Sequence, residues 1–206
     1  DHKERQNVIW NTVGSGVYAL ASMVLAFIVM RMAGEDEGGI FGFGFSTYGQ
    51  QMFIIAYFGI RPFQITDGKQ EYTFGDYLRL RTATCGIAAA AAALHLSFLW
   101  FSGEYSFHKS AVIFFLACYK IIDGFADVYE SEFQRQGSLY LTGKSNTFRT
   151  ILSVAVFLIT LQLSGNLLTA SFGAVLSQMA GVALFNLTVI RAGVLPDVRF
   201  EADNKA

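Results

Sequence analysis

The chain has 206 residues and a formal net charge of −1, and no cluster of basic residues indicates a nucleic-acid partner. Hydrophobic residues make up 53% of it and charged residues only 15%, whereas a soluble domain carries roughly a quarter of its residues as charges. With a mean hydropathy of +0.40 and 20 phenylalanines, the composition argues against a soluble globular domain. It predicts an all-α, polytopic membrane protein.

The first two predicted membrane spans rest on stretches without charged residues, the first of which ends just before Arg31. The first covers 8–31 and rests on a charge-free run of 25 residues, Gln6 to Met30. The second covers 38–60, which is itself charge-free. At about 1.5 Å rise per residue, roughly 20 residues cross a hydrocarbon core of about 30 Å. The first apolar stretch is too long for the hydrophobic region of a signal peptide, so we expect it to be retained.

An inner loop and a third span follow. The loop, 61–81, alternates apolar and basic residues from Thr73 to Arg81, which predicts a short amphipathic helix lying at the membrane surface. The third span covers 82–103 and contains six consecutive alanines, Ala88 to Ala93. Small residues let helix backbones approach closely in lipid, so this span is predicted to pack at the centre of a bundle.

The fourth predicted span, 110–130, is interrupted by Lys120, Asp123 and Asp127. A strict hydropathy criterion rejects it. We keep it because five spans would conflict with the distribution of basic residues.

The last two spans come from a charge-free run of 41 residues, 150–190. The triplet Ser164-Gly165-Asn166 is typical of a turn and divides the run into spans at about 149–164 and 168–190. A polar tail, 196–206, ends the sequence.

Six spans leave the basic residues strongly asymmetric. One side holds only Arg31 and Lys109, with Lys120 inside the fourth span. The positive-inside rule therefore places the other side, and both termini, in the cytoplasm. The twelve basic residues on that side are Lys3, Arg5, Arg61, Lys69, Arg79, Arg81, Arg135, Lys144, Arg149, Arg191, Arg199 and Lys205.

The charges of the fourth span form one stripe. Lys120, Asp123, Asp127, Glu130 and Gln134 are spaced by three or four residues and share a helix face. Lys120 lies about 15 Å from the start of the span, near mid-membrane, where a charge costs about 2.5–3.5 kcal/mol. Two interpretations stay open. The stripe is either an internal ion pair, with Lys120 and Asp123 as partners, or the polar wall of a water-filled cavity that opens inward.

Four other polar residues are candidates for this site. His95 and Asn11 either join the polar network or simply hydrogen-bond a neighbouring helix. Arg61 and Arg149, at the inner ends of the second and fifth spans, can bind phosphate in a bidentate way. Ordinary anchoring to anionic lipid headgroups explains both arginines equally well.

The sequence gives little support for an enzyme or for a bound cofactor. Cys85 and Cys118 fall within spans, and no second Cys or His stands at metal-ligand spacing, so we expect neither metal nor cofactor. The segment 123–127 resembles the start of the CDP-alcohol phosphotransferase signature. The second pair of acids in that signature is missing, so the ligands for a catalytic metal are absent.

A further resemblance covers nearly the whole chain and rests on several separate segments. The first of these is a membrane span that ends in an acidic, Gly-rich outer loop. The segments are Asn7–Gly34, Gly59–Arg61, Asp67–Gly68, Tyr72–Arg81, Tyr119–Gly124, Gln134–Gly137 and Arg149. In them the chain resembles the N-terminal half of the oligosaccharide (O-antigen, Wzx-type) flippases of the multidrug/oligosaccharidyl-lipid/polysaccharide exporter superfamily.

The resemblance implies one six-helix bundle of a transporter with twelve or more helices, in the bacterial inner membrane. Such proteins move undecaprenyl-diphosphate-linked glycans outward by alternating access. By resemblance, Arg61, Lys120 and Arg149 bind the substrate, while Asp123 and Asp127 couple movement to an ion gradient or hold Lys120.

The expected partners are the lipid-diphosphate-linked glycan, membrane lipids and a second six-helix half, joined covalently or by dimerisation. Family members are about twice this length, so we expect a half or a fragment. The alternative is a non-transporting membrane scaffold or assembly subunit, in which the fourth span is a structural polar seam.

Overall fold

The computed structural model describes residues 2–69, 71–195 and 198–201, and within them every regular element is a helix. The all-α prediction is confirmed for this part of the chain. Most of the predicted polar tail, including Lys205, lies outside the described residues.

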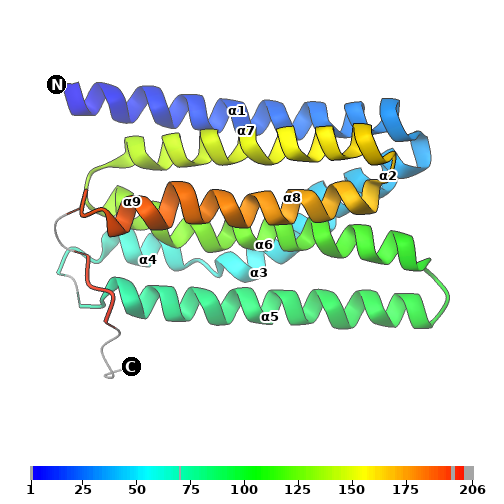
Figure 1. Ribbon diagram of the computed structural model, residues 1–206. Helices are drawn as coiled ribbons and strands as arrows, with labels where there is room; N and C mark the ends of the chain where they lie inside the picture. Colours follow the sequence, from blue (N-terminus) through cyan, green and yellow to red (C-terminus); the bar gives the residue numbers. More distant parts are fainter. Residues whose placement is uncertain (1, 70, 196–197, 202–206) are drawn as a thin grey trace.

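The longest helices lie side by side along one bundle (Figure 1). They are α1 (His2–Ala33), α5 (Phe74–Phe101), α6 (Phe107–Arg135), α7 (Leu139–Ser164) and α8 (Leu167–Val182). A π-helix, η2 (Ala183–Leu187), and α9 (Thr188–Arg191) continue α8 without a break. The start of α1 and the end of α9 lie at the same end of the bundle (Figure 1).

The segment predicted as the second span is helical but irregular. α2 (Glu35–Gly42), a second π-helix, η1 (Phe43–Tyr48), and α3 (Gly49–Tyr57) run on without interruption. Phe58 and Gly59 then adopt left-handed backbone conformations, with φ of 46° and 66°, and separate α3 from the short α4 (Ile60–Thr66). A left-handed residue ends a right-handed helix because the chain leaves the helical path there, and in phenylalanine this conformation is strained because the Cβ crowds the following carbonyl oxygen.

Within the part of the chain that the structure describes, four helices are long and apolar enough to cross a membrane, which is fewer than the six expected. They are His2–Ala33, Phe74–Phe101, Leu139–Ser164 and Leu167–Arg191, at the positions of the predicted first, third, fifth and sixth spans. α6 is long enough to cross a membrane but carries more charged residues than these four helices. The stretch predicted as the second span is divided by η1 into the shorter helices α2 and α3. The structure therefore suggests membrane association through four apolar helices.

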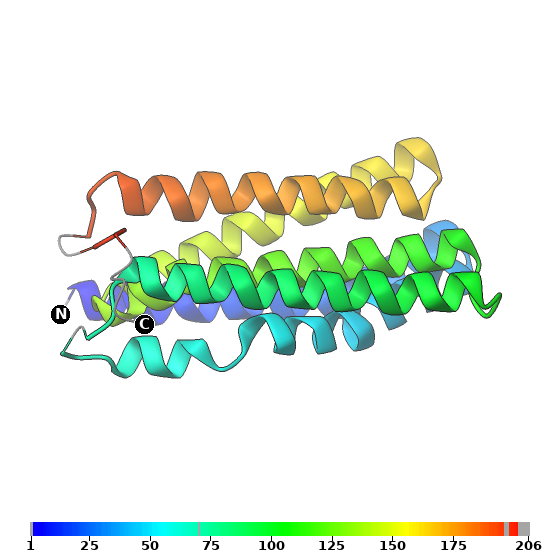
Figure 2. The same cartoon turned by 90° about the horizontal axis from the view of Figure 1, so that it is seen from below.

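α6 lies at the centre of the bundle. Figure 2 shows α8 on one side of it and α4 on the other, and both contact it. On the α5 side, Ala88 and Ala92 are fully buried in a core with Ile113 and Ala117 of α6. The alanine run thus packs closely against α6, but α5 itself lies at the edge of the bundle (Figure 1), so the predicted central position of the third span is wrong.

Local signals set two of the helix ends. Gly165 is left-handed, with φ of 62°, and the Asn166 side chain accepts hydrogen bonds from the first backbone N–H groups of α8, so the predicted turn is confirmed.

Thr73 and Asp76 form a reciprocal capping box that starts α5. The predicted separate surface helix at 73–81 is therefore wrong, because these residues form the first turns of one 28-residue helix.

Candidate functional site

Charged side chains gather inside the bundle around α6. The predicted stripe points inward, since Lys120, Asp127 and Glu130 are only 3%, 7% and 7% exposed. Arginines from three other helices meet it. We call these residues the central cluster, which comprises Lys120, Asp123, Asp127 and Glu130 of α6, Arg61 of α4, Arg81 of α5 and Arg149 of α7.

Arg149 joins α7 to α6 through two carboxylates. Its Nη2 lies 2.6 Å from Asp123 Oδ1, and its Nη1 lies 3.1 Å from Glu130 Oε1. The side chain is 2% exposed and passes against Gly181 of α8, where an added Cβ would lie 2.6 Å from Arg149 Cγ. The absence of a side chain at position 181 therefore leaves the space that Arg149 occupies.

Asp127 holds two arginines at once. Arg61 donates to Asp127 Oδ1, and the Arg81 Nη2 lies 2.9 Å from Asp127 Oδ2. The other terminal nitrogen of Arg81 donates to the carbonyls of Ala56 and Tyr57 at 3.1 and 2.8 Å. These carbonyls end α3 and have no partner within that helix, so Arg81 caps α3 while it binds Asp127.

Lys120 has a different environment, made of aromatic rings. Its amino group donates to the Tyr18 hydroxyl at 2.6 Å and lies 4.0 Å from the centre of the Phe45 ring, a cation–π distance. Among the described residues, no carboxylate lies within ion-pair distance of Lys120. The expected pair between Lys120 and Asp123 is wrong, because Asp123 is held by Arg149 of α7 instead.

A cavity of about 230 Å³ lies beside these charges. Its walls come from α1, α3, α6 and α7, and its lining residues are Tyr18, Gln50, Phe53, Asp123, Asp127, Glu130, Asn146 and Arg149. Nearby, the buried Gln178 Oε1 and Asn186 Nδ2 have no hydrogen-bond partner in the described part of the chain. A polar space of this size has room for several waters or for a polar ligand group.

Both π-helices contribute to this region. Phe45 of η1 packs over Lys120, and Asn186 of η2 accepts hydrogen bonds from Ser145 and Arg149 at 2.8 and 3.4 Å. π-Helical turns are rare and often mark functional sites, because the extra residue redirects side chains.

Most of the predicted site residues come together, and two do not. Arg61, Lys120, Asp123, Asp127, Glu130 and Arg149 all belong to the central cluster. His95 is exposed on α5, and its Nδ1 lies 3.1 Å from the Tyr48 hydroxyl. Asn11 is exposed on α1, before the turn that carries Tyr18.

Sequence reasoning missed Tyr18, Arg81 and Asn186. Arg81 was counted only among the basic residues of the inner loop, although its position next to a charge-free run is a usable signal. Tyr18 and Asn186 gave no signal, since single polar residues within apolar spans are common. Within the described residues, no group of three or more His, Cys, Asp and Glu side chains is placed to hold a metal ion.

The arrangement is chemically suited to binding a polar or charged ligand. It offers cations and carboxylates around a polar space, with one lysine that has no carboxylate partner among the described residues. No protein-family model, no curated protein and no solved structure matches the chain, so its function is proposed from this geometry.

Proposed function

We propose that this chain forms one six-helix half of a transporter that moves a lipid-diphosphate-linked oligosaccharide across the bacterial inner membrane by alternating access. The observation that carries the proposal is Lys120. It is a cation buried halfway along the central helix and bonded to a phenol, with no carboxylate in contact among the described residues. A buried charge of this kind at membrane depth is expensive and marks a functional site by default.

Six crossings follow if α6 and the α2–α3 segment also span the bilayer. α6 has 29 residues, so at about 1.5 Å per residue it exceeds a hydrocarbon core of about 30 Å. Its charged stripe is buried among other helices, so lipid would meet only its apolar face. The hydropathy of α6 is low because it lies at the centre of the bundle, where polar residues are tolerated.

Cysteine labelling tests these two crossings in a variant without the native cysteines. If α6 crosses, Glu104→Cys and Gln136→Cys, which flank it, react on opposite faces of the membrane. If α2–α3 crosses, Asp36→Cys and Lys69→Cys do the same. We expect a membrane-impermeant maleimide to label positions 104 and 36 on intact spheroplasts, and positions 69 and 136 only after the membrane is opened. Labelling of positions 104 and 136 from one side would contradict a spanning α6.

The available charges favour a phosphate ligand. Arg149 is held by two carboxylates and Asp127 holds two arginines, whereas Lys120 has no carboxylate in contact among the described residues. Lys120 does not line the cavity itself, but its partner Tyr18 does, beside Asp123, Asp127, Glu130 and Arg149. A diphosphate group that displaces Tyr18 would meet a desolvated cation with no carboxylate in direct contact among the described residues. Charge-assisted hydrogen bonds of this type are roughly twice as strong as neutral ones.

The variant Lys120→Met tests this role. We expect its affinity for undecaprenyl diphosphate, measured with the purified chain in nanodiscs, to fall at least about tenfold, which corresponds to about 1.4 kcal/mol. Lys144→Met is the matched control, because Lys144 also lies over two aromatic rings, those of Trp10 and Tyr140 at 5.2 and 5.4 Å. Equal affinities of the two variants would contradict a substrate role for Lys120.

The scaffold alternative is favoured by one observation, the pairing of charges across helices. Asp127 and Arg149 tie α4, α5 and α7 to α6, which a purely structural polar seam would also do. The double variant Lys120→Leu with Asp123→Leu separates the two functions. A protein that accumulates normally but no longer binds undecaprenyl diphosphate supports transport, and one that still binds it supports the scaffold.

A further inference from the structure

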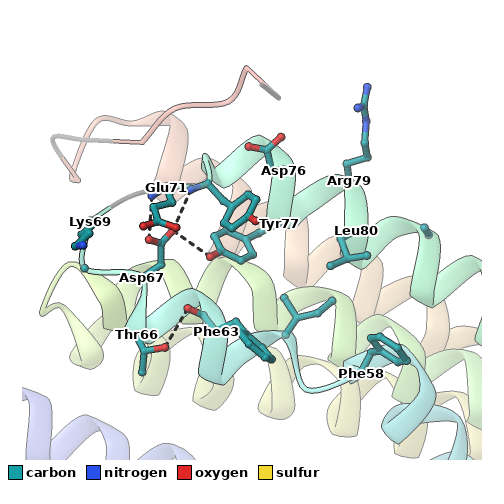
Figure 3. Close-up of a pocket in the computed structure, with 14 residues that line it drawn as sticks. Phe58, Phe63, Thr66, Asp67, Lys69, Glu71, Asp76, Tyr77, Arg79 and Leu80 are labelled. Carbon is teal, nitrogen blue, oxygen red and sulfur yellow. Dashed lines mark hydrogen bonds between the residues drawn. The ribbon is translucent and has the colours of Figure 1, made fainter. Parts of the chain in front are cut away.

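A second and larger cavity lies apart from the central cluster, between α4 and the start of α5 (Figure 3). Its volume is about 890 Å³. It lies at the end of the bundle where α1 begins and α9 ends (Figure 1). We call it the α4–α5 groove, and its lining residues are Phe58, Ile60, Phe63, Thr66, Asp67, Gly68, Lys69, Glu71, Tyr72, Asp76, Tyr77, Arg79, Leu80 and Ala83.

The groove is apolar along most of its length. Phe58 and Phe63 lie on the α4 side and Leu80 on the α5 side (Figure 3). These three side chains are 69%, 74% and 47% exposed. Such exposure of large apolar side chains around one hollow is typical of a surface that binds an apolar partner.

One end of the groove is polar and internally ordered. Asp67 accepts hydrogen bonds from the backbone N–H groups of Glu71 and Tyr72 at 2.9 and 3.1 Å, and from the Tyr77 hydroxyl at 3.1 Å. Burial acts to raise the pKa of Asp67, but these hydrogen bonds and the charge of Arg135, 3.8 Å away, outweigh it and lower the pKa. Asp76 is likewise engaged, since it accepts from the backbone and hydroxyl of Thr73.

Two exposed charges of opposite sign remain at this end. Within the described part of the chain, the side chains of Lys69 and Glu71 have no hydrogen-bond or ion-pair partner. Arg79 points outward from α5 (Figure 3). The groove thus combines an apolar channel with a polar end that has one available cation and one available anion.

We propose that the α4–α5 groove holds one acyl chain of a zwitterionic glycerophospholipid, with the headgroup phosphate at Lys69 and a headgroup ammonium at Glu71. Phosphatidylethanolamine has this chemistry. The groove volume falls within the range of about 300–1,000 Å³ that is usual for small-molecule sites. The three carboxylates of the lining are balanced by its two basic side chains and by Arg135, which pairs with Asp67 at 3.8 Å, so this end suits a headgroup without net charge.

The proposed lipid site does not depend on transport, because it uses no residue of the central cluster. The experiment is a lipid titration of the purified full chain in detergent, followed by native mass spectrometry. We expect one phosphatidylethanolamine to bind more tightly than phosphatidylglycerol. If phosphatidylglycerol binds as tightly, the proposal is overturned.

Filling the groove provides the matched comparison. Ala83→Trp places a large ring in the groove, and Ala90→Trp places the same ring on an exposed face of the same helix, seven residues further on and outside the groove. We expect affinity for phosphatidylethanolamine to fall at least about tenfold in the first variant and by less than about twofold in the second. Equal affinities would reject the site.

Two further variants test the wall of the groove and the headgroup contact separately. Should circular dichroism show that Ala83→Trp has lost helix, Phe63→Ala replaces it, because it removes an exposed wall without overfilling the groove. Glu71→Gln removes the proposed ammonium partner and is expected to abolish the preference for phosphatidylethanolamine over phosphatidylglycerol. An unchanged preference would overturn the headgroup assignment.

Discussion

Replacing Asp127 with leucine is expected to lower the free energy of unfolding by about 3–5 kcal/mol, the usual effect of breaking a buried ion pair from one side. Asp127 is the shared counter-ion of Arg61 and Arg81. Without it, the Arg81 guanidinium, which is 0% exposed, keeps only the two carbonyls at the end of α3. Arg61 is partly exposed and retains Gln134, so the loss is concentrated at Arg81.

The measurement is reversible chemical unfolding of the purified protein in one detergent. Asp36→Leu serves as control, because Asp36 is an exposed acid at the far end of the bundle, and its change should stay within about 0.5 kcal/mol. The double variant Asp127→Leu with Arg81→Leu should recover part of the loss, since it leaves no buried arginine unpaired. Wild-type stability of Asp127→Leu alone would refute the argument.

Much of the helical organisation could be predicted from the sequence, because it depends on local properties. Long charge-free runs can form only helices in lipid, where every backbone polar group needs an internal partner. The turn at Ser164-Gly165-Asn166 followed from residues that favour left-handed and capping conformations. The inward direction of the α6 stripe followed from helical periodicity and the high free energy of charges in lipid.

The pairing of charges could not be predicted, because it depends on how helices pack. Lys120 and Asp123 are three residues apart, and spacing alone predicts that they pair. Arg149 reaches Asp123 from α7, however, and Lys120 turns toward α1 and η1. Neither direction is visible without the neighbouring helices.

The irregular parts of the helices were also missed. η1 and η2 have no simple sequence signature, although each carries a residue that contacts the central cluster. The separate surface helix predicted at 73–81 conflicts with the capping box of Thr73 and Asp76, which begins α5 at this point. That signal was available, since a threonine followed three residues later by an acid is a recognised helix start.

A close backbone contact between α1 and α7 provides the second large prediction, for Gly143→Ala. A Cβ built on Gly143 of α7 would lie 2.1 Å from the Trp10 carbonyl oxygen and 2.7 Å from the Asn11 backbone nitrogen of α1. Gly14 faces the same contact, with an added Cβ 2.8 Å from the Gly143 oxygen. Because all these atoms belong to the backbone, no side-chain rotation relieves the overlap, and α1 must move away from α7.

We expect Gly143→Ala to lower the free energy of unfolding by about 1–3 kcal/mol, the usual range for overpacking. Gly16→Ala is the matched control on α1, because nothing lies within 4 Å of its added Cβ. Alanine is preferred over glycine within a helix by about 0.5–1 kcal/mol, so this variant should be neutral or more stable than wild type. Tyr18 lies one turn beyond Gly14, so moving α1 also withdraws the hydroxyl that holds Lys120. Gly143→Ala should therefore weaken binding of undecaprenyl diphosphate as well, while Gly16→Ala should not. Equal stability of the two variants would show that α1 and α7 do not meet at these glycines.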